Sequence, residues 1–465
     1  MKHLLKTSCL ILSLLALSLN TQVLAQDLTH PRDMGIPKSK FKRPNPAKYQ
    51  VSLKNGLVAY VAKEDQVPLV SFSAFIKAGK IDGLKEGAAE ALTEAFLAGP
   101  KNITSTAFKT ALKRMTAEYS VKLHNKWIEI NLNVPTEDLE EAFKLFSATV
   151  ISPNITEANI KAAARKATKD IKVDKNGIII DGSSSVAVSK FHDIILKGNI
   201  LGKKLLSSDF EDLSTKDVES FHTTYVVAGN MTIAVSGDIN EKGIRKKLKA
   251  QFSSLINKTS PNRRNVPKVK RQKKQYHYFP ADKLQTWVVI GHPLAPVAFK
   301  DETAFEVMNY ILAGGHFWTR MFIETRDKYG LTNDASGYIE DQWDGSGSYS
   351  FHSSSRHDVT KQLYDNIMSV IYEIQKESVS DEELMIAHNA LADGVYEMKF
   401  KDGNATARSF AIEKLRYGNH KHSKSYPARV RSVTKKDVLR VANEYMHPDA
   451  FQVIIVGEHI NLQKQ

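Results

Sequence analysis

The sequence contains almost no cysteine. Its single cysteine is Cys9, which lies in an apolar run close to the N-terminus. If that run is removed as a signal peptide, the mature protein can form no disulfide, and thiolate nucleophiles and cysteine zinc ligands are excluded as well. A chain of 465 residues must then be stabilised by its hydrophobic cores, and its 42% hydrophobic content is sufficient for this.

Long apolar runs are also missing, except at the N-terminus. Residues 1–25 combine a basic start (Lys2 and Lys6), an apolar run and the small-residue end Val23-Leu24-Ala25. This pattern is typical of a secretory signal peptide cut after Ala25. A retained membrane anchor is the alternative, but the run is short for a bilayer. We therefore predict an exported protein without stable membrane insertion, and the periplasm as its compartment because no surface anchor is visible.

Positive charge is in excess. The net charge of +14 falls to +12 once Lys2 and Lys6 leave with the signal peptide. Residues 262–275 contain seven of the Lys and Arg residues, together with Pro267, and have no helical period. This run is interpreted as a solvated linker, with an anionic docking strip as the alternative. Because the remaining positive charge is dispersed, a nucleic-acid partner is not expected.

An internal repeat organises the chain. Residues 213–239 align without a gap with residues 433–459, at a spacing of 220. Each copy has a Ser or Thr followed by an Asp, which suits a helix N-cap, then a helix, a turn and a β-branched strand. Upstream, strands at 69–79 and 286–295 are each followed by a helix that ends in glycine.

The repeat predicts an α+β fold with two homologous lobes, each a mainly antiparallel sheet backed by helices. A hairpin is expected around Asn55-Gly56, a half-buried strand over 126–135 and an amphipathic helix over 136–151. The predicted domains are a signal peptide (1–25), an N-terminal lobe (26–256), a basic linker (257–275) and a C-terminal lobe (276–465).

This organisation resembles the insulinase/pitrilysin family of metallopeptidases, the inverzincins. The resemblance implies two lobes arranged as a clamshell that encloses an unfolded peptide. Active members carry H-x-x-E-H on a helix of the first lobe. Its two histidines bind zinc from one helix face, and the glutamate takes a proton from the zinc-bound water. A glutamate roughly 75 residues further on completes the metal shell.

Residues 87–94, "GAAEALTE", match this motif in position but not in chemistry. Glu90 and Glu94 stand at the two histidine positions, and Thr93 stands at the position of the general base. No histidine lies between His30 and His124, so a shifted alignment cannot restore the motif. The resemblance therefore implies a degenerate zinc motif, because a threonine hydroxyl is far too weak a base at neutral pH.

The remaining metal-shell positions are altered as well. The third ligand falls at Asp170, which is shorter than glutamate by one methylene, and Ala163 stands where a supporting glutamate is usual. Three carboxylates could instead favour a hard ion such as calcium or magnesium. We predict no metal and no catalytic residue in this chain, and zinc only in a partner subunit.

The second half carries a different signature of the same family. Residues 314–336 match its second-lobe segment, in which an arginine and a tyrosine seven residues apart hold the scissile carbonyl and stabilise the oxyanion. Arg326 matches the arginine, but Asn333 stands at the tyrosine position. Gly314 and Gly315 match a glycine-rich strip. These four residues are the candidate peptide-binding residues. An ion pair of Arg326 with Glu324 or Asp327, and a plain helix end at the glycines, are the structural alternatives.

Three functions remain open. The first is a catalytically inactive subunit that completes the peptide-binding cavity of a heterodimeric exported protease, with a zinc-motif-bearing peptidase of the same family as partner. The second is a stand-alone peptide-binding or scaffold protein without proteolytic activity. The third is a metallopeptidase with an atypical site. Unfolded peptides are the expected ligands in each case.

Overall fold

Both copies of the repeat form the predicted capped helix. Ser214 and Asp217 make a capping box, in which the Asp217 amide donates to the Ser214 hydroxyl (3.3 Å) and the Ser214 amide donates to the Asp217 carboxylate (2.9 Å). Thr434 and Asp437 repeat this arrangement at 3.2 and 3.0 Å. Such boxes satisfy backbone donors that a helix leaves free at its start. The helices and the strands that follow them are α9 (Thr215–Tyr225), β6 (Met231–Gly237), α18 (Lys435–Tyr445) and β11 (Gln452–Gly457).

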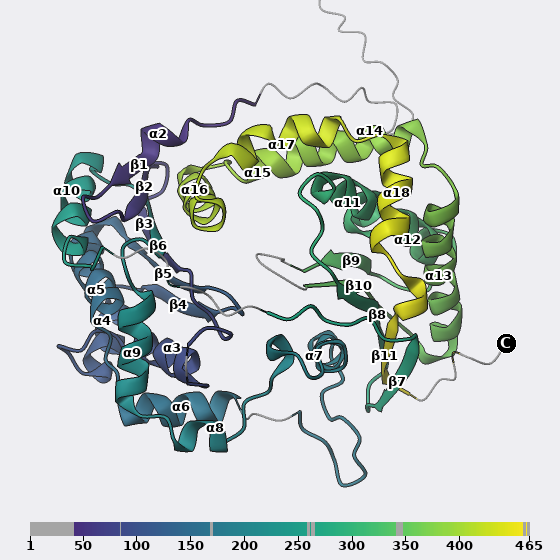
Figure 1. Ribbon diagram of the computed structural model, residues 1–465, viewed down its shortest axis with the longest axis horizontal. Coiled ribbons are helices and arrows are strands. Elements are labelled where there is room, and N and C mark those ends of the chain that lie inside the picture. Colours follow the sequence, from purple (N-terminus) through teal and green to yellow (C-terminus); the bar gives the residue numbers. More distant parts are fainter. Residues whose placement is uncertain are drawn as a thin grey trace, which may run out of the picture. The chain divides into compact units, whose positions relative to one another are not determined.

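The computed structural model describes residues 41–83, 85–167, 171–257, 261, 266–340, 347–458 and 462 (Figure 1). It divides into two compact units, and the boundary lies between Lys42 and Arg43. The elements described below all belong to the second unit. The predicted signal peptide lies outside the described residues, as does part of the basic run at 262–275.

The first sheet has six strands in the order β1-β2-β6-β3-β5-β4. All neighbours are antiparallel except β2 and β6, which are parallel. The predicted hairpin joins β1 to β2. The strands are β1 (Gln50–Ser52), β2 (Val58–Lys63), β3 (Leu69–Ile76), β4 (Glu118–Leu123), β5 (Ile128–Pro135) and β6. The helices of this half are α2 (Pro46–Tyr49), α3 (Ala88–Ala98), α4 (Ser105–Arg114), α5 (Leu139–Ile151), α6 (Glu157–Ala167), α8 (Ser208–Glu211), α9 and α10 (Glu241–Phe252).

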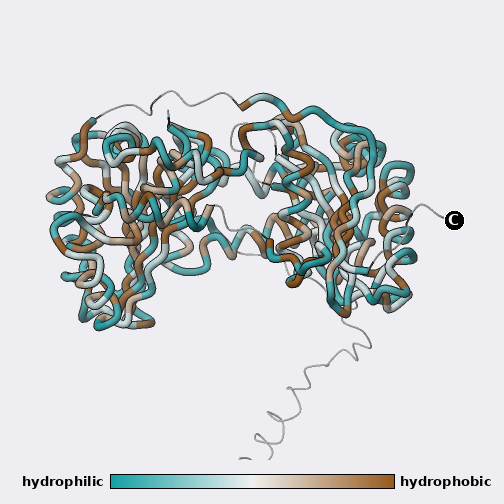
Figure 2. Tube along the Cα trace, turned by 90° about the horizontal axis from the view of Figure 1, so that it is seen from below, coloured by the Kyte–Doolittle hydropathy of each residue, from teal (hydrophilic) through white to brown (hydrophobic). Residues whose placement is uncertain are grey.

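The second sheet has five strands in the order β7-β11-β8-β10-β9, and only β7 and β11 are parallel. The strands are β7 (Gln275–Pro280), β8 (Thr286–Leu294), β9 (Ala335–Ile339), β10 (Gly347–Ser355) and β11. The helices of this half include α11 (Glu302–Asn309), α12 (Arg320–Phe322), α13 (Thr360–Lys376), α14 (Asp381–Asn389), α15 (Tyr396–Met398), α17 (Lys421–Arg431) and α18, with π-helical turns η4 (Tyr310–Gly314), η6 (Ile323–Asp327) and η8 (Ala390–Val395). The predicted α+β fold with two helix-backed sheets is confirmed. Along the Cα trace, hydrophobic segments (brown) alternate with hydrophilic ones (teal) (Figure 2).

Each half of the sequence contributes one helix to the sheet of the other half. Helix α7 (Ser184–Ile195) comes before the basic run, yet it packs on β8 and β11 of the second sheet. Its fully buried Phe191 belongs to one hydrophobic core with Val289 and Ile454. Since α7 comes from the first half of the sequence, the second sheet cannot complete its core from its own half.

Helix α16 (Gly403–Tyr417) makes the reciprocal contact, because it comes from late in the chain and packs on β2 and β6 of the first sheet. Its Arg408 donates to the Ser73 hydroxyl (2.7 Å) and to the carboxylate of Glu129 (2.5 Å). Glu129 is only 5% exposed, so removing one partner of this pair would leave a buried charge. Each exchanged helix is joined by the backbone to its own half and packs on the sheet of the other half. The two halves are therefore held together by both.

Within the described part of the chain, none of the helices has the length and apolar character that a membrane crossing requires.

The packing of α7 leads to a test of stability. Replacing Phe191 with alanine should lower the free energy of unfolding by about 3–5 kcal/mol, because it removes a large side chain from a filled core. Urea denaturation followed by intrinsic fluorescence measures this loss. Leu284→Ala is the control, since Leu284 is 91% exposed and its truncation should change the free energy by less than about 0.5 kcal/mol. Equal effects of the two variants would contradict the packing described for α7.

Candidate functional site

The degenerate zinc-motif positions lie together on helix α3. The helix begins after Gly87, whose φ of 78° is a left-handed conformation that favours glycine. A Cβ at this glycine would meet the Phe210 ring at 2.7 Å, so the position also needs glycine for space. Glu90, Thr93 and Glu94 then line one cavity of about 340 Å³. The structure therefore brings together three of the four predicted positions, while Asp170 lies outside the described residues.

Thr93 is tied to its own helix. Its hydroxyl donates to the backbone carbonyl of Ala89 at 2.8 Å, and the residue is 8% exposed. A threonine in this arrangement returns a hydrogen bond to the preceding turn. Its hydroxyl proton is already committed, and a hydroxyl is not a base that could accept a proton from water at neutral pH.

Glu94 already has a cation. The ammonium of Lys166, on helix α6, lies 2.6 Å from its carboxylate. Ala163, one turn earlier on α6, is buried and lines the same cavity. The protein thus supplies its own positive charge beside this carboxylate. Lys166 was not identified from the sequence, because the two partners are 72 residues apart.

Glu90 is half-buried on the same face. Burial raises the pKa of its carboxyl group above the ordinary value, and the positive charge of Lys80 opposes this rise only weakly. Lys80 lines the cavity together with Lys203 and Lys204. The cavity therefore combines two carboxylates with several ammonium groups, and these ammonium groups repel a metal cation.

These residues do not fit zinc. Zinc in proteins prefers cysteine and histidine ligands, and here it would meet a hydroxyl committed to the backbone and a carboxylate paired with lysine. Among the described residues, no group of three or more His, Cys, Asp or Glu side chains is arranged to hold a metal ion. We therefore derive no chemical step through a metal at this helix.

The two glycines of the second half lie at a crowded turn. Gly314 ends the π-helical turn η4, and a Cβ there would meet the side-chain amide of Asn309 at 2.5 Å. A Cβ on Gly315 would meet both the ring and the carbonyl oxygen of Tyr310 at 2.8 Å. Both positions need glycine because of close packing, which gives the pair a structural role whatever else it does.

Arg326 lies on the π-helical turn η6. Its guanidinium lies over the rings of Phe322 (4.9 Å) and Phe317 (5.6 Å), a cation–π arrangement. Glu324 forms its ion pair with Lys328 at 2.6 Å. The guanidinium is thus held in place by aromatic faces, which leave its N–H groups at the edge of the plane for acceptors such as a peptide carbonyl.

Asn333 is exposed and follows a turn at Gly330, whose φ is 62°. The two residues between them, Leu331 and Thr332, are 7% and 8% exposed and fix the segment in the core. The side-chain amide of Asn333 is therefore presented to solvent from an anchored loop. It can donate a hydrogen bond, but it is shorter than a tyrosine side chain.

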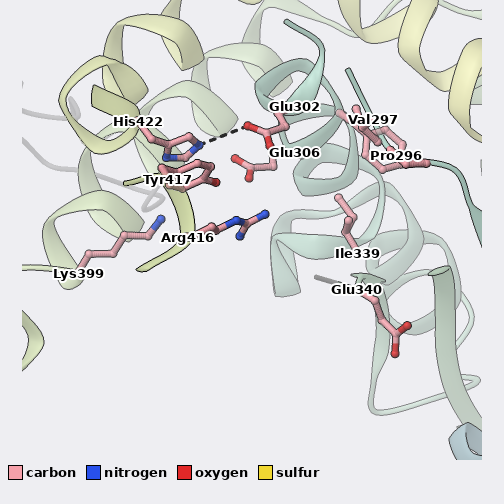
Figure 3. Close-up of a pocket in the computed structure, with 11 residues that line it drawn as sticks. Pro296, Val297, Glu302, Glu306, Ile339, Glu340, Lys399, Arg416, Tyr417 and His422 are labelled. Carbon is pink, nitrogen blue, oxygen red and sulfur yellow. Dashed lines mark hydrogen bonds and ion pairs between the residues drawn. The ribbon is translucent and has the colours of Figure 1, made fainter. Parts of the chain in front are cut away.

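A second cavity was not foreseen from the sequence. It has a volume of about 340 Å³ and is lined by residues of α11, α16 and α17, by the end of β9 and the residue after it, by Lys399 and by the segment that follows β8 (Figure 3). His422 pairs with Glu302 at 3.3 Å and stacks on the Tyr417 ring at 4.5 Å. The carboxylate of Glu340 points away from the other labelled groups and pairs with His192 of α7 at 2.6 Å. The cavity thus holds charges of both signs, and two of its three carboxylates, Glu302 and Glu340, are paired with histidines.

Comparison with known proteins gives one family match. Residues 212–391 match the family model described as the Peptidase M16 inactive domain. This range contains all four candidate peptide-binding residues. An uncharacterised zinc protease of Rickettsia felis is 20% identical over 404 residues, which cover 84% of this chain and 90% of that protein.

Two solved structures share the fold. The peptidase M16 inactive domain from Pseudomonas fluorescens superimposes with a TM-score of 0.73 at 16% identity, covering 88% of this chain and 98% of that one. The periplasmic protease PqqL from Escherichia coli gives a TM-score of 0.66 at 11% identity, covering 91% of this chain and 48% of that one. At these identities the likeness concerns the fold alone.

Neutralising the two carboxylates of α3 should change the free energy of unfolding in opposite directions. Because burial raises the folded-state pKa of Glu90, its protonated form is favoured by folding. The contribution of protonated Glu90 to the free energy of unfolding is fully present below its unfolded-state pKa of about 4.3. It is lost as the pH rises through the folded-state pKa. Glu90→Gln should therefore raise the free energy of unfolding at pH 7, and the gain should vanish towards pH 4.

The matched variant is Glu94→Gln on the same helix face. It removes the ion pair with the exposed Lys166, so the free energy of unfolding at pH 7 should fall, by no more than about 1 kcal/mol. Urea denaturation at pH 7 and pH 4 distinguishes the two. A destabilised Glu90→Gln protein at pH 7 would contradict the burial assigned to that carboxyl group.

Proposed function

We propose that this chain, a member of the Peptidase M16 (insulinase/pitrilysin) family as its sequence predicts, is the non-catalytic subunit of a heterodimeric exported protease. Its partner is a peptidase of the same family that carries H-x-x-E-H, and this chain completes the cavity that binds an unfolded peptide. The single observation that carries the proposal is the state of helix α3. There Thr93 is bonded to the backbone and Glu94 is paired with Lys166.

The chemistry of peptide hydrolysis explains why a partner is needed. A metal-assisted hydrolysis requires an ion that lowers the pKa of a bound water and a base that takes its proton. Helix α3 offers no imidazole pair, and the position of the general base is held by Thr93, whose hydroxyl is bonded to the backbone. The zinc and the attacking hydroxide must therefore be supplied by the other subunit, and this chain contributes binding and orientation.

Arg326 is the residue of this chain proposed to touch the peptide. Its guanidinium is positioned by Phe317 and Phe322, so little conformational freedom is lost when it donates to a carbonyl. In the transition state the carbonyl oxygen becomes negatively charged, and a fixed cationic donor stabilises that charge more than it stabilises the ground state. Gly314 and Gly315 shape the neighbouring turn.

A stand-alone peptide-binding or scaffold protein is the second candidate. The exposed Asn333 favours it, because the tyrosine of the family pattern is missing and the shorter amide reaches less far. In this case the chain binds extended peptides but never supports their cleavage, even with a zinc-bearing relative present. The periplasm is proposed as the compartment for either function, in keeping with the periplasmic protease PqqL that shares the fold.

The heterodimer is tested by reconstitution. The purified mature chain should show no hydrolysis of a denatured peptide library, and addition of the H-x-x-E-H-bearing chain from the same organism should produce it. Arg326→Ala should lower the kcat/KM of the pair by about 10²- to 10³-fold, because one donor to the oxyanion is lost. Arg356→Ala is the control, since this arginine is exposed and pairs with Asp358.

Two outcomes decide between the candidates. Activity that appears with the partner and falls selectively with Arg326→Ala supports the heterodimer. Binding of extended peptides with no cleavage in any combination supports the scaffold function instead. Hydrolysis by the isolated chain that persists after chelation and repurification would contradict both.

Position 333 allows a gain-of-function test. Asn333→Tyr restores the longer phenolic donor of the family pattern, and the reconstituted pair should gain about tenfold in kcat/KM if that donor reaches the oxyanion. Asn333→Phe is the matched control, because it adds the ring without the hydroxyl. If both variants change activity equally, the effect comes from the ring and the proposed role of this position is wrong.

A further inference from the structure

A cavity of about 560 Å³ lies between residues 43–46 and the start of helix α17. Three of the residues that line it are cationic, namely Arg43, Lys421 and Lys424, and a fourth is His420. Within the described part of the chain, no carboxylate lines this cavity. It is separate from helix α3 and from the candidate peptide-binding residues, so it is not explained by the function proposed above.

Arg43 is held rigidly at the base of the cavity. Its side chain is 14% exposed, Nε donates to the Ser423 hydroxyl at 2.8 Å and Nη2 donates to the His420 carbonyl at 3.3 Å. Its guanidinium also lies over the rings of Phe410 (5.1 Å) and Phe400 (5.9 Å). Nε and Nη2 make these hydrogen bonds, and Nη2 also forms an ion pair with the Glu413 carboxylate at 3.7 Å. Because the arginine is already ordered, a ligand would not have to immobilise it.

The nearest carboxylate is saturated by protein groups. Glu413 accepts hydrogen bonds from the Ser423 amide (2.7 Å), the Ser423 hydroxyl (2.6 Å) and His420 Nδ1 (3.3 Å). Burial alone would raise the pKa of Glu413, but these hydrogen bonds hold it below the ordinary value. The group is therefore ionised and its acceptor positions are occupied, so it offsets only one positive charge of the cavity.

His420 links the cavity to the first sheet. Its Nε2 lies 2.7 Å from the hydroxyl of Tyr60, which can donate to it, while Nδ1 donates to Glu413. The charges of Arg43, Lys421 and Lys424 against Glu413 leave two positive charges at the cavity.

We propose that this cavity binds a phosphate dianion carried by a phosphorylated small molecule or a lipid headgroup. Two uncompensated positive charges match the charge of a phosphate monoester, and a fixed arginine with two lysines is a common set of phosphate ligands. Lys421 and Lys424 are both exposed, so they can close on the ligand from the surface of α17. The volume exceeds that of phosphate alone, which leaves room for the group that carries it.

Binding would connect three parts of the protein. The ligand would join residues 43–46 to α17, and the hydrogen bond between Tyr60 and His420 continues the connection to strand β2 of the first sheet. A ligand that binds only the folded state raises its stability as its concentration rises above Kd. Occupancy of the cavity should therefore be visible as a thermal shift of the full chain.

The test uses inorganic pyrophosphate as the probe at constant ionic strength. Isothermal titration of the mature protein should give saturable 1:1 binding, and the double variant Lys421→Gln/Lys424→Gln should weaken it at least tenfold. The matched control is Lys246→Gln/Lys249→Gln on helix α10, which has the same i,i+3 spacing, the same loss of charge and two exposed lysines. This control should change Kd by less than twofold.

Several results would overturn the proposal. If substitution of either lysine pair weakens pyrophosphate binding equally, only the overall positive charge attracts the anion. A linear, unsaturated titration would lead to the same conclusion. Competition by an acidic peptide at the same concentration as pyrophosphate would assign the cavity to carboxylates. Both lysine pairs are on the surface, so loss of binding would not come from misfolding, which circular dichroism would check.

A second arm distinguishes the source of the phosphate. Vesicles of phosphatidylcholine with phosphatidic acid should bind the protein only if the ligand is a lipid headgroup, and pyrophosphate should then displace them. Soluble binding without vesicle binding identifies a phosphorylated small molecule. Vesicle binding that neither pyrophosphate nor Lys421→Gln/Lys424→Gln reduces would contradict the assigned site.

Discussion

The ion pair between Lys166 and Glu94 is the contact on which the functional interpretation depends. Its 2.6 Å separation puts an ammonium group beside the carboxylate at the position where the resemblance to the inverzincins predicts a zinc ligand. A lysine tethered by its own helix satisfies the charge of that carboxylate without any metal. Once this charge is satisfied and Thr93 is bonded to Ala89, helix α3 is a packing element with a polar face. In the second half, by contrast, two aromatic rings position the guanidinium of Arg326.

The exchange of helices holds the two halves of the sequence together in one folded protein. Helix α7 completes the core of the second sheet and α16 covers the first, so neither sheet is complete with the residues of its own half. Arg408 and Glu129 fix the second of these contacts with a pair that is 279 residues apart in sequence. Because of this reciprocity, substitutions on the polar face of α3 need not loosen the fold.

Much of the fold follows from local signals in the sequence. The Ser214/Asp217 and Thr434/Asp437 capping boxes mark helix starts, and Asn55-Gly56 marks the first hairpin, because each signal acts over a few residues. The contacts that decide the site act over long separations instead. Lys166 gives no local sign that it will meet Glu94, and nothing near Arg408 predicts that its helix leaves its own half. The aromatic support of Arg326 by Phe317 and Phe322 was equally hidden, since the sequence suggested only charged neighbours for it.

The central claim is that α3 carries no metal site, and zinc titration tests it most directly. The mature protein would be stripped with a chelator and titrated with zinc by calorimetry, next to its Glu94→Gln variant. The two isotherms should be the same, because any zinc taken up binds at histidines elsewhere. A 1:1 zinc site in the wild-type chain that Glu94→Gln abolishes would contradict the account.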